Sequence, residues 1–181
     1  MTRFSGGNIP SSGTLDGWIA RIARSDSSGL DELYRAAAPG VYAYALSVLK
    51  NSHDAEDVLQ DTFLRICDSA ATYRSQGKPM AWILTIAKNL CYKRLEQQVK
   101  LGCTPLEDWQ DYSHTGNDMT ADDKVVIQQC MNTLSDDERQ IVVLHAVSGF
   151  KHREISRMMG MPLSTVLSKY HRAIKKLKSN F

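Results

Sequence analysis

The sequence predicts an all-α protein with two small helical domains, a flexible linker between them and a helix-turn-helix in the C-terminal domain. Apolar residues recur at helical spacing through most of the 181 residues, and no segment alternates with the period of two that marks a strand. Residues 99–120 lack a helical period and contain Gly, Pro and scattered acids, which indicates the linker. Near the C-terminus, a short apolar helix, the break Gly160-Met161-Pro162 and a basic helix follow one another.

The N-terminus is predicted to be a tail followed by a short helix. Residues 1–13 are rich in Gly, Ser and Asn and are expected to be disordered, so the first domain is predicted over residues 14–98. An amphipathic helix should start after a Thr14 cap. Its apolar face comprises Leu15, Trp18, Ile19 and Ile22.

Two further helices are expected before residue 68. The first covers residues 30–50, and Pro39 should kink or restart it because proline lacks a backbone donor. Asn51 should cap the second helix. The apolar stripe of that second helix is Ala55, Val58, Leu59, Thr62, Phe63 and Ile66, and its polar face shows Asp57, Gln60 and Asp61.

A loop is expected over residues 68–78, where the helical period is interrupted. Pro79 is well placed as the first residue of the next helix, which should run to about Gln98. Trp82 is expected to pack in the core of the first domain.

The second domain is predicted over residues 121–181. A helix is expected over residues 122–134, and Ser135 with Glu138 forms a capping-box pattern for the helix that follows. Gly160 should then supply the left-handed residue of the helix-turn-helix.

Charge is strongly segregated along the chain. Residues 151–178 carry eight Lys and Arg against one Glu, a net charge of +7, although the whole chain carries only +2. Residues 104–140 carry nine acids against two basic residues, a net charge of −7. A basic run is often only a solvated face, but this one lies on a helix-turn-helix pattern and therefore favours DNA binding.

The second helix of that motif should present polar side chains to a DNA groove. Its apolar residues anchor the helix, and hydroxyl, amide and guanidinium groups are the ones that meet phosphates and base edges. For His171, a solvated position and a DNA contact are both open. The expected duplex-reading residues are Ser164, Thr165, Ser168, Lys169, His171, Arg172 and Lys175.

Several classes of protein are disfavoured. The four cysteines never form a C-x-x-C pair and are interpreted as reduced thiols, with Cys67 and Cys91 as small core residues, so no metal or cofactor is expected. No apolar run approaches the roughly 18 residues of a membrane span, and no signal region is recognised. We therefore expect a cytoplasmic location and no direct membrane insertion. No local nucleophile and base pattern indicates an enzyme.

Three runs carry a resemblance to a known family. They are DAEDVLQDTFLR at residues 54–65, PMAWILTIAKN at 79–89, and STVLSK with RAIKKL at 164–177. In this order and spacing, with Tyr73-Arg74 between the first two, the sequence resembles the bacterial RNA polymerase sigma factors of the sigma-70 family, and within them the small extracytoplasmic-function (ECF) group. The first domain would be of the region 2 type and the second of the region 4 type.

That resemblance implies a promoter-specificity subunit that binds core RNA polymerase, through the β′ clamp helices and the β flap, and promoter DNA. It also implies an anti-sigma partner, often membrane-associated. Core contacts would come from Asp57, Gln60, Asp61 and Leu64. The minus-ten element would be opened and read by Tyr73, Arg74, Ser75, Lys88, Asn89 and Tyr92, and the minus-thirty-five element by the duplex-reading residues above.

The sequence also departs from the family pattern. Glu96-Gln97 follow Lys93-Arg94, Ser164 stands where Gly is common, and Leu167 replaces a common basic residue. The first departure does not favour phosphate contacts at the end of the helix that begins at Pro79, and the departures at Ser164 and Leu167 predict a different upstream specificity. The alternative is a stand-alone helix-turn-helix regulator whose N-terminal half is a sensory or dimerisation domain. A third possibility, an enzyme with an appended DNA-binding domain, would need a polar pocket that the sequence does not indicate.

Overall fold

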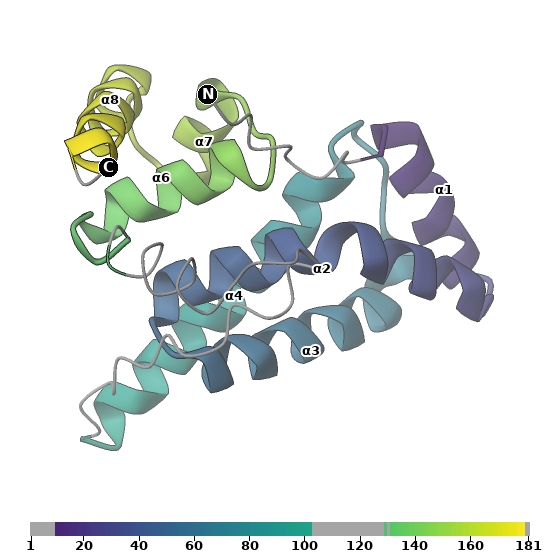
Figure 1. Cartoon of the computed structure of the whole chain (residues 1–181). Coiled ribbons are helices and arrows are strands. Elements are labelled where there is room, and N and C mark those ends of the chain that lie inside the picture. Colours follow the sequence, from purple (N-terminus) through teal and green to yellow (C-terminus); the bar gives the residue numbers. More distant parts are fainter. Residues whose placement is uncertain (1–9, 103–128, 130, 180–181) are drawn as a thin grey trace.

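The computed structural model describes residues 10–102, 129 and 131–179, and these residues form helices with no β-strand among them (Figure 1). The all-α prediction is confirmed. The predicted tail to residue 9, most of the linker and most of the helix expected over residues 122–134 lie outside the described residues. The elements are α1 Ser12–Ile22, α2 Ser27–Leu49, α3 Ser52–Ser69, the 3₁₀ turn η1 Ala70–Thr72, α4 Pro79–Lys100, α6 Asp136–Ala146, α7 His152–Met159 and α8 Leu163–Ser179.

Helix α1 begins earlier than the sequence predicted. Its cap is Ser11, whose hydroxyl accepts from the backbone N–H of Thr14 at 3.2 Å, so the Thr14 cap was wrong. Ser11 lies in residues 1–13, whose Gly- and Ser-rich composition predicted a tail and not the start of a helix. Leu15 and Ile19 are buried against the domain, and they fix this helix in place.

Helix α2 passes through Pro39 without a restart. It ends at Lys50, which adopts the left-handed conformation, and Asn51 then caps α3 by accepting from the backbone N–H of Asp54 at 2.9 Å. The predicted cap at Asn51 is confirmed. Helix α3 continues through Ser69, further than expected, and η1 shortens the loop to residues 73–78.

The N-terminal core lies where α2, α3 and α4 pack on one another, with α1 across one end (Figure 1). Tyr42, Leu59 and Ile83 are 0–1% exposed and come from these three helices. Burying a side chain of this size stabilises a fold by about 1.5–3 kcal/mol. The predicted first residue of α4, Pro79, is confirmed.

Helix α6 of the C-terminal domain begins with the predicted capping box. The Glu138 carboxylate accepts from the backbone N–H of Ser135 at 3.0 Å, and the Ser135 hydroxyl accepts from the N–H of Glu138 at 3.4 Å. Gly160 has φ of 64°, the left-handed conformation expected of it, and it separates α7 from α8. Ile155 of α7 and Val166 of α8 are buried in one cluster, and Ala173 of α8 is buried in a second cluster with Leu134 and Val142 of α6.

The two domains are docked on each other, because α6 packs along α2 (Figure 1). Ile141 and Leu144 are fully buried in the same cluster as the N-terminal core. Gly40 allows this close approach, since a Cβ placed on it would lie 3.8 Å from the Cβ of Ser148. Lys50 of the first domain also pairs with Asp136 of the second at 3.1 Å.

Candidate functional site

The predicted polymerase face lies on α3. Gln60 and Asp61 are exposed, and Leu64 is 64% exposed, which is unusual for a large apolar side chain. Asp57 differs, because it is half-buried and its carboxylate pairs with Arg94 of α4 at 2.7 Å. Three of the four expected side chains are therefore accessible to a partner, whereas Asp57 is engaged in an ion pair within the domain.

Arg94 is a residue whose role the sequence did not show. Its guanidinium bridges Asp54 at 2.6 Å and Asp57 at 2.7 Å, and so joins α3 to α4. The side-chain hydrogen bond to Asp54 is the main reason that the pKa of Arg94 is raised. Its partners lie 40 and 37 residues away, so no local pattern could have identified them.

A groove of about 430 Å³ runs beside this polymerase face, between α3 and α4. Its walls combine apolar and charged side chains, which suits an amphipathic partner helix. The lining residues are Asp57, Val58, Asp61, Leu64, Arg65, Asp68, Leu90, Lys93, Arg94 and Gln97.

The predicted minus-ten loop is held by two other elements. The Tyr73 ring packs against Trp82 of α4, with ring centroids 4.4 Å apart. Its hydroxyl donates to Asp16 of α1 at 2.8 Å, and the Ser75 hydroxyl donates to the same carboxylate at 2.6 Å. Arg74 between them is exposed.

The other expected minus-ten residues lie on α4. Asn89 is exposed and Tyr92 is 45% exposed, so an amide and an aromatic ring share one face. Lys88 is half-buried, since its ammonium donates to the backbone carbonyl of Met158 in α7. The docked C-terminal domain therefore occupies one of the predicted DNA contacts.

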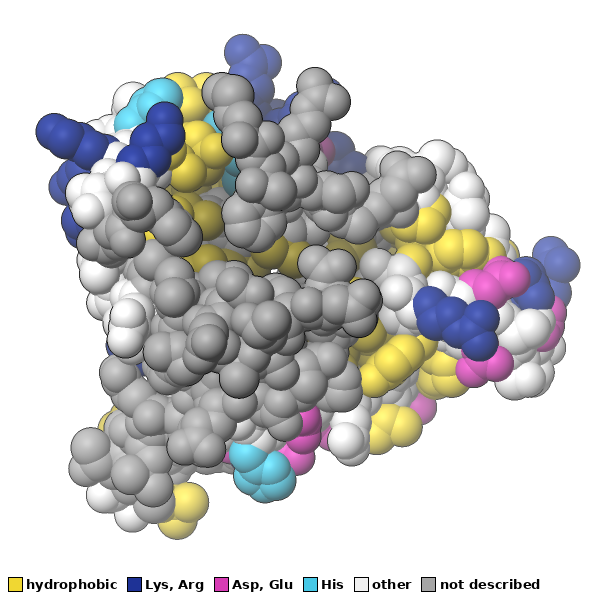
Figure 2. All heavy atoms as spheres, in the orientation of Figure 1, with side chains coloured by type: hydrophobic (Ala, Val, Ile, Leu, Met, Phe, Trp, Pro, Cys, Tyr) yellow, Lys and Arg dark blue, Asp and Glu magenta, His cyan; other side chains and the backbone are white. Residues whose placement is uncertain are grey.

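The duplex-reading residues lie along α8, where Figure 2 shows Lys and Arg side chains gathered at the upper left. Thr165 and Lys169 are half-buried. The side chains that face solvent are those of Ser164, Ser168, His171, Arg172 and Lys175.

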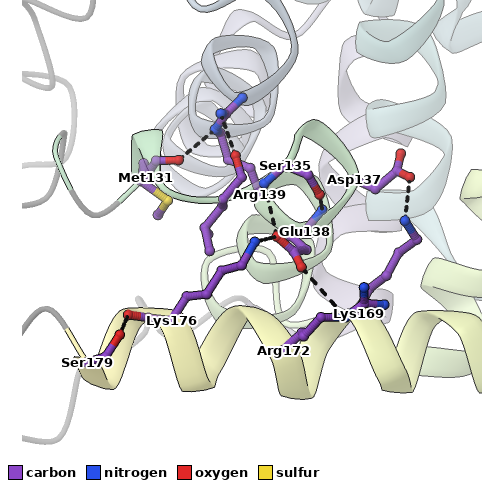
Figure 3. Close-up of polar contacts among 10 residues, drawn as sticks. Met131, Ser135, Asp137, Glu138, Arg139, Lys169, Arg172, Lys176 and Ser179 are labelled. Atoms are coloured by element: carbon purple, nitrogen blue, oxygen red, sulfur yellow. Dashed lines mark hydrogen bonds and ion pairs between the residues drawn. The ribbon is translucent and has the colours of Figure 1, made fainter.

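Glu138 of α6 pairs with basic side chains on the side of α8 that faces α6 (Figure 3). It is 3% exposed, its carboxylate lies 2.6 Å from the Lys176 ammonium, and Arg172 approaches it at 3.9 Å. Lys169 pairs with neighbouring Asp137 at 2.9 Å. Burial alone would raise the pKa of Glu138, but the hydrogen bonds from Lys176 and from the backbone of Ser135 hold it below its ordinary value.

An aromatic cluster joins α6, α7 and α8. His152 stacks on His145 with ring centroids 4.3 Å apart, and Tyr170 meets both rings edge-on. The Nδ1 of His145 lies 2.8 Å from the carbonyl of Phe150. Burial lowers the pKa of His152, and the neighbouring His145 and His171 add to that effect.

We expect acidification to destabilise the helix-turn-helix domain through His152. A histidine with a lowered pKa in the fold stays neutral there while the unfolded chain takes up a proton, so stability falls as pH drops below about 6.5. The melting temperature of His152→Phe should fall less between pH 7.5 and 5.5 than that of the wild type. The matched change His53→Phe, at an exposed position of α3, should leave the wild-type slope unchanged; equal slopes for His152→Phe and wild type would contradict the expectation.

The cysteines and possible metal ligands of the described residues do not form a site. Cys91 is buried as predicted, but Cys67 is exposed, because it lies on the outer side of α3. Within the described ranges, no three His, Cys, Asp or Glu side chains form a group that could hold a metal ion. No helix there combines the length and apolar character of a membrane span.

Two family models match the chain. Sigma-70 region 2 matches residues 33–100, and sigma-70 region 4 matches residues 124–177, so together they cover more than half of the sequence. The first includes the predicted polymerase face and the predicted minus-ten loop, and the second includes the helix-turn-helix.

Relatives and solved structures agree with these matches. The chain is 25% identical over 176 residues to the ECF RNA polymerase sigma factor SigK of Mycobacterium bovis BCG and of Mycobacterium tuberculosis H37Rv, covering 93% of this chain and 94% of each relative. Its fold is similar to the sigma factor RpoE of Bartonella quintana, solved with the anti-sigma factor NepR (TM-score 0.67, 22% identity, 83% and 94% coverage). It is also similar to CnrH, solved with the cytosolic domain of CnrY (TM-score 0.61, 19% identity, 92% and 96% coverage). The chain belongs to the sigma-70 family of RNA polymerase sigma factors and, within it, to the ECF group.

Proposed function

We propose that this protein is a dissociable promoter-specificity subunit, which binds core RNA polymerase and directs it to promoters without catalysing a reaction itself. The observation that carries the proposal is that one chain exposes two different surfaces whose side chains suit nucleic acid. The N-terminal one offers Tyr73, Arg74, Asn89 and Tyr92, and the C-terminal one offers the exposed side of α8. A sigma factor needs both, because it must read duplex DNA upstream and unpaired bases downstream.

The N-terminal surface suits single-stranded DNA. Aromatic rings replace the stacking that bases lose on melting, and amide and guanidinium groups bind exposed base edges. The α8 surface suits duplex DNA, since exposed hydroxyls lie near its N-terminal end, from which a recognition helix reads base edges, and His171 and Arg172 follow about one to two turns later. Binding energy at the first surface would drive strand separation, and the second would set its position on the promoter.

The docked arrangement must open for this function. The minus-ten and minus-thirty-five elements are separated by about 25 base pairs, or roughly 85 Å at 3.4 Å per pair. A compact chain of this length has a radius of gyration of about 16 Å. The domains must therefore separate, and the predicted linker residues 103–120 have a covalent reach of up to roughly 60 Å.

Loss of polymerase binding is the expected result of Gln60→Ala with Asp61→Ala. Both side chains are exposed, so the change should leave the fold intact while removing contacts at an interface centred on Leu64. We expect the affinity for core polymerase to fall at least about tenfold, as for a typical interface hot spot. Binding of purified variants to immobilised core enzyme measures it.

The matched control is Asp31→Ala, which removes an exposed carboxylate from α2 instead of α3. It should bind core polymerase like the wild type. Wild-type affinity for the Gln60→Ala/Asp61→Ala variant would contradict the proposed polymerase face.

A transcription assay tests the function as a whole. Purified protein plus core polymerase should initiate at specific promoters selected from a random library, while either component alone should not. The alternative, a stand-alone regulator, would bind duplex DNA tightly in a gel shift without polymerase. Absence of promoter-specific initiation by the reconstituted pair would refute the proposal.

We also propose that the protein works in the cytoplasm and is restrained by an anti-sigma factor. The support is indirect: the structurally similar sigma factor RpoE was solved with the anti-sigma factor NepR, and CnrH was solved with the cytosolic domain of CnrY. The groove between α3 and α4 would offer an inhibitor the same surface as it offers polymerase. Copurification from cells, with β′ and a small inhibitor as the expected partners, tests this directly.

A further inference from the structure

Asp16 of α1 forms hydrogen bonds with two residues of the predicted minus-ten loop. Its two carboxylate oxygens accept separately, Oδ1 from the Tyr73 hydroxyl at 2.8 Å and Oδ2 from the Ser75 hydroxyl at 2.6 Å. The partners lie 57 and 59 residues away in sequence, and they flank Arg74. A single side chain therefore holds both neighbours of the exposed arginine.

The helix that carries Asp16 is itself firmly placed. Leu15 and Ile19, on either side of it, are 2% and 1% exposed and belong to the main core. Helix α1 packs on α2 and also touches α4 and η1. Asp16 thus extends from a rigid element to an irregular loop, which is the arrangement that fixes a binding site in its working geometry.

The contact also determines which loop groups remain available. With their hydroxyls donated to Asp16, Tyr73 and Ser75 turn toward α1, and the Tyr73 ring also packs against Trp82. Burial first, and then the hydrogen bond to Asp16, raises the pKa of Tyr73 to about 12. Arg74 lies between two restrained neighbours and is exposed to solvent.

We propose that Asp16 is the positioning residue of the minus-ten loop, which restrains Tyr73 and Ser75 so that Arg74 and the Tyr73 ring are preorganised for an unpaired promoter base. This inference rests on the proposed function of the loop. It assigns to α1, which lies outside the residues matched by the region 2 model, a part in promoter opening. Preorganisation of this kind lowers the entropy lost when the base is captured.

If Asp16 acted only through its charge, Asp16→Ala would strengthen DNA binding and would not slow promoter opening. A carboxylate beside DNA repels phosphates, so its removal by itself should strengthen DNA binding. A loss of promoter opening in Asp16→Ala would therefore have to come from the loop. If the loss acts through the two hydroxyls, it should not add to the effect of removing them.

The test uses holoenzyme assembled from the full chain and core polymerase, on a promoter selected by the wild type. The fluorescence of 2-aminopurine in the minus-ten strand reports base capture. We expect Asp16→Ala and the double change Tyr73→Phe/Ser75→Ala each to slow opening about tenfold, and the triple variant to be no slower than either. Asp16→Asn keeps one acceptor and should fall between Asp16→Ala and the wild type.

Core polymerase affinity and binding to a duplex minus-thirty-five fragment should stay at wild-type values in all four variants, and Asp31→Ala should open the promoter normally. Wild-type opening by Asp16→Ala, or a triple variant slower than both parents, would overturn the inference. If a thermal melt shows that Asp16→Ala does not fold, the double variant Tyr73→Phe/Ser75→Ala tests the inference in its place. Promoter opening at the wild-type rate by that double variant would overturn the inference. The proposed function fails separately, if the wild-type holoenzyme opens no promoter.

Discussion

A disulfide between the two docked domains is expected to abolish promoter-specific initiation. The double variant Gly40→Cys/Ser148→Cys places two thiols where the Cβ atoms lie 3.8 Å apart, which is about the mean separation in natural disulfides. Once oxidised, the protein should be unable to separate its domains by the roughly 85 Å between the promoter elements. Reduction should restore transcription, so one preparation provides both measurements.

The masking of predicted DNA contacts gives a second reason for the same result. In the docked arrangement the predicted contact Lys88 donates to the carbonyl of Met158, and Lys78, which follows the predicted minus-ten loop, pairs with Glu154 of α7 at 3.2 Å. A locked protein would therefore present a minus-ten surface partly occupied by its own C-terminal domain. We expect it to bind the unpaired minus-ten strand more weakly than the reduced protein.

Single-cysteine variants are the matched controls, because neither Gly40→Cys nor Ser148→Cys can form the bridge alone. The background should carry Cys67→Ser, Cys103→Ser and Cys130→Ser to prevent other pairings, while buried Cys91 can stay. Run-off transcription with and without reductant measures activity. Normal initiation by the fully oxidised protein would contradict the requirement for opening, and failure of the bridge to form would contradict the docking of α6 on α2.

Local signals were sufficient to predict most of the helices. The capping box at Ser135 and Glu138, the cap at Asn51 and the left-handed Gly160 each depend on residues within a few positions of one another. Such interactions are encoded locally and can be read from one sequence. The predicted Thr14 cap was wrong because the actual cap, Ser11, lies in residues whose composition predicted a tail.

The docking of the domains could not be predicted in this way. Helix α2 is buried on nearly all sides from Val41 to Ser47, so its apolar pattern does not distinguish the face that meets α3 from the face that meets α6. The polar contacts of Asp16 and Arg94 join residues 37 to 59 positions apart. Their partners depend on the tertiary arrangement, and helical periodicity carries no information about it.

The same limit applies to the basic helix α8. Its charge predicted DNA binding, but it did not show that Lys169 and Lys176 pair with Asp137 and Glu138. These pairs turn one side of α8 toward α6 and leave the other side exposed. The site residues themselves remain proposals that the polymerase and promoter experiments test.

A large loss of stability is expected for Arg139→Ala. Arg139 is 4% exposed, and its guanidinium donates to the carbonyls of Leu134 at 3.0 Å, Met131 at 3.1 Å and Ser47 at 3.4 Å. It also pairs with Asp136 at 3.1 Å. Removal would leave several buried acceptors without this donor, at a cost of about 3 kcal/mol in the free energy of unfolding. Urea unfolding measures it.

Arg139→Lys should recover little of that stability, because one ammonium cannot replace a guanidinium that reaches four groups in different directions. Arg153→Ala, at an exposed position of α7, is the control and should unfold like the wild type. Because Ser47 belongs to α2 and Arg139 to α6, the change should also loosen the docked arrangement. We therefore expect Arg139→Ala to slow formation of the Gly40→Cys/Ser148→Cys bridge under mild oxidation; wild-type stability together with a wild-type rate of bridge formation would show that Arg139 does not hold the domains together.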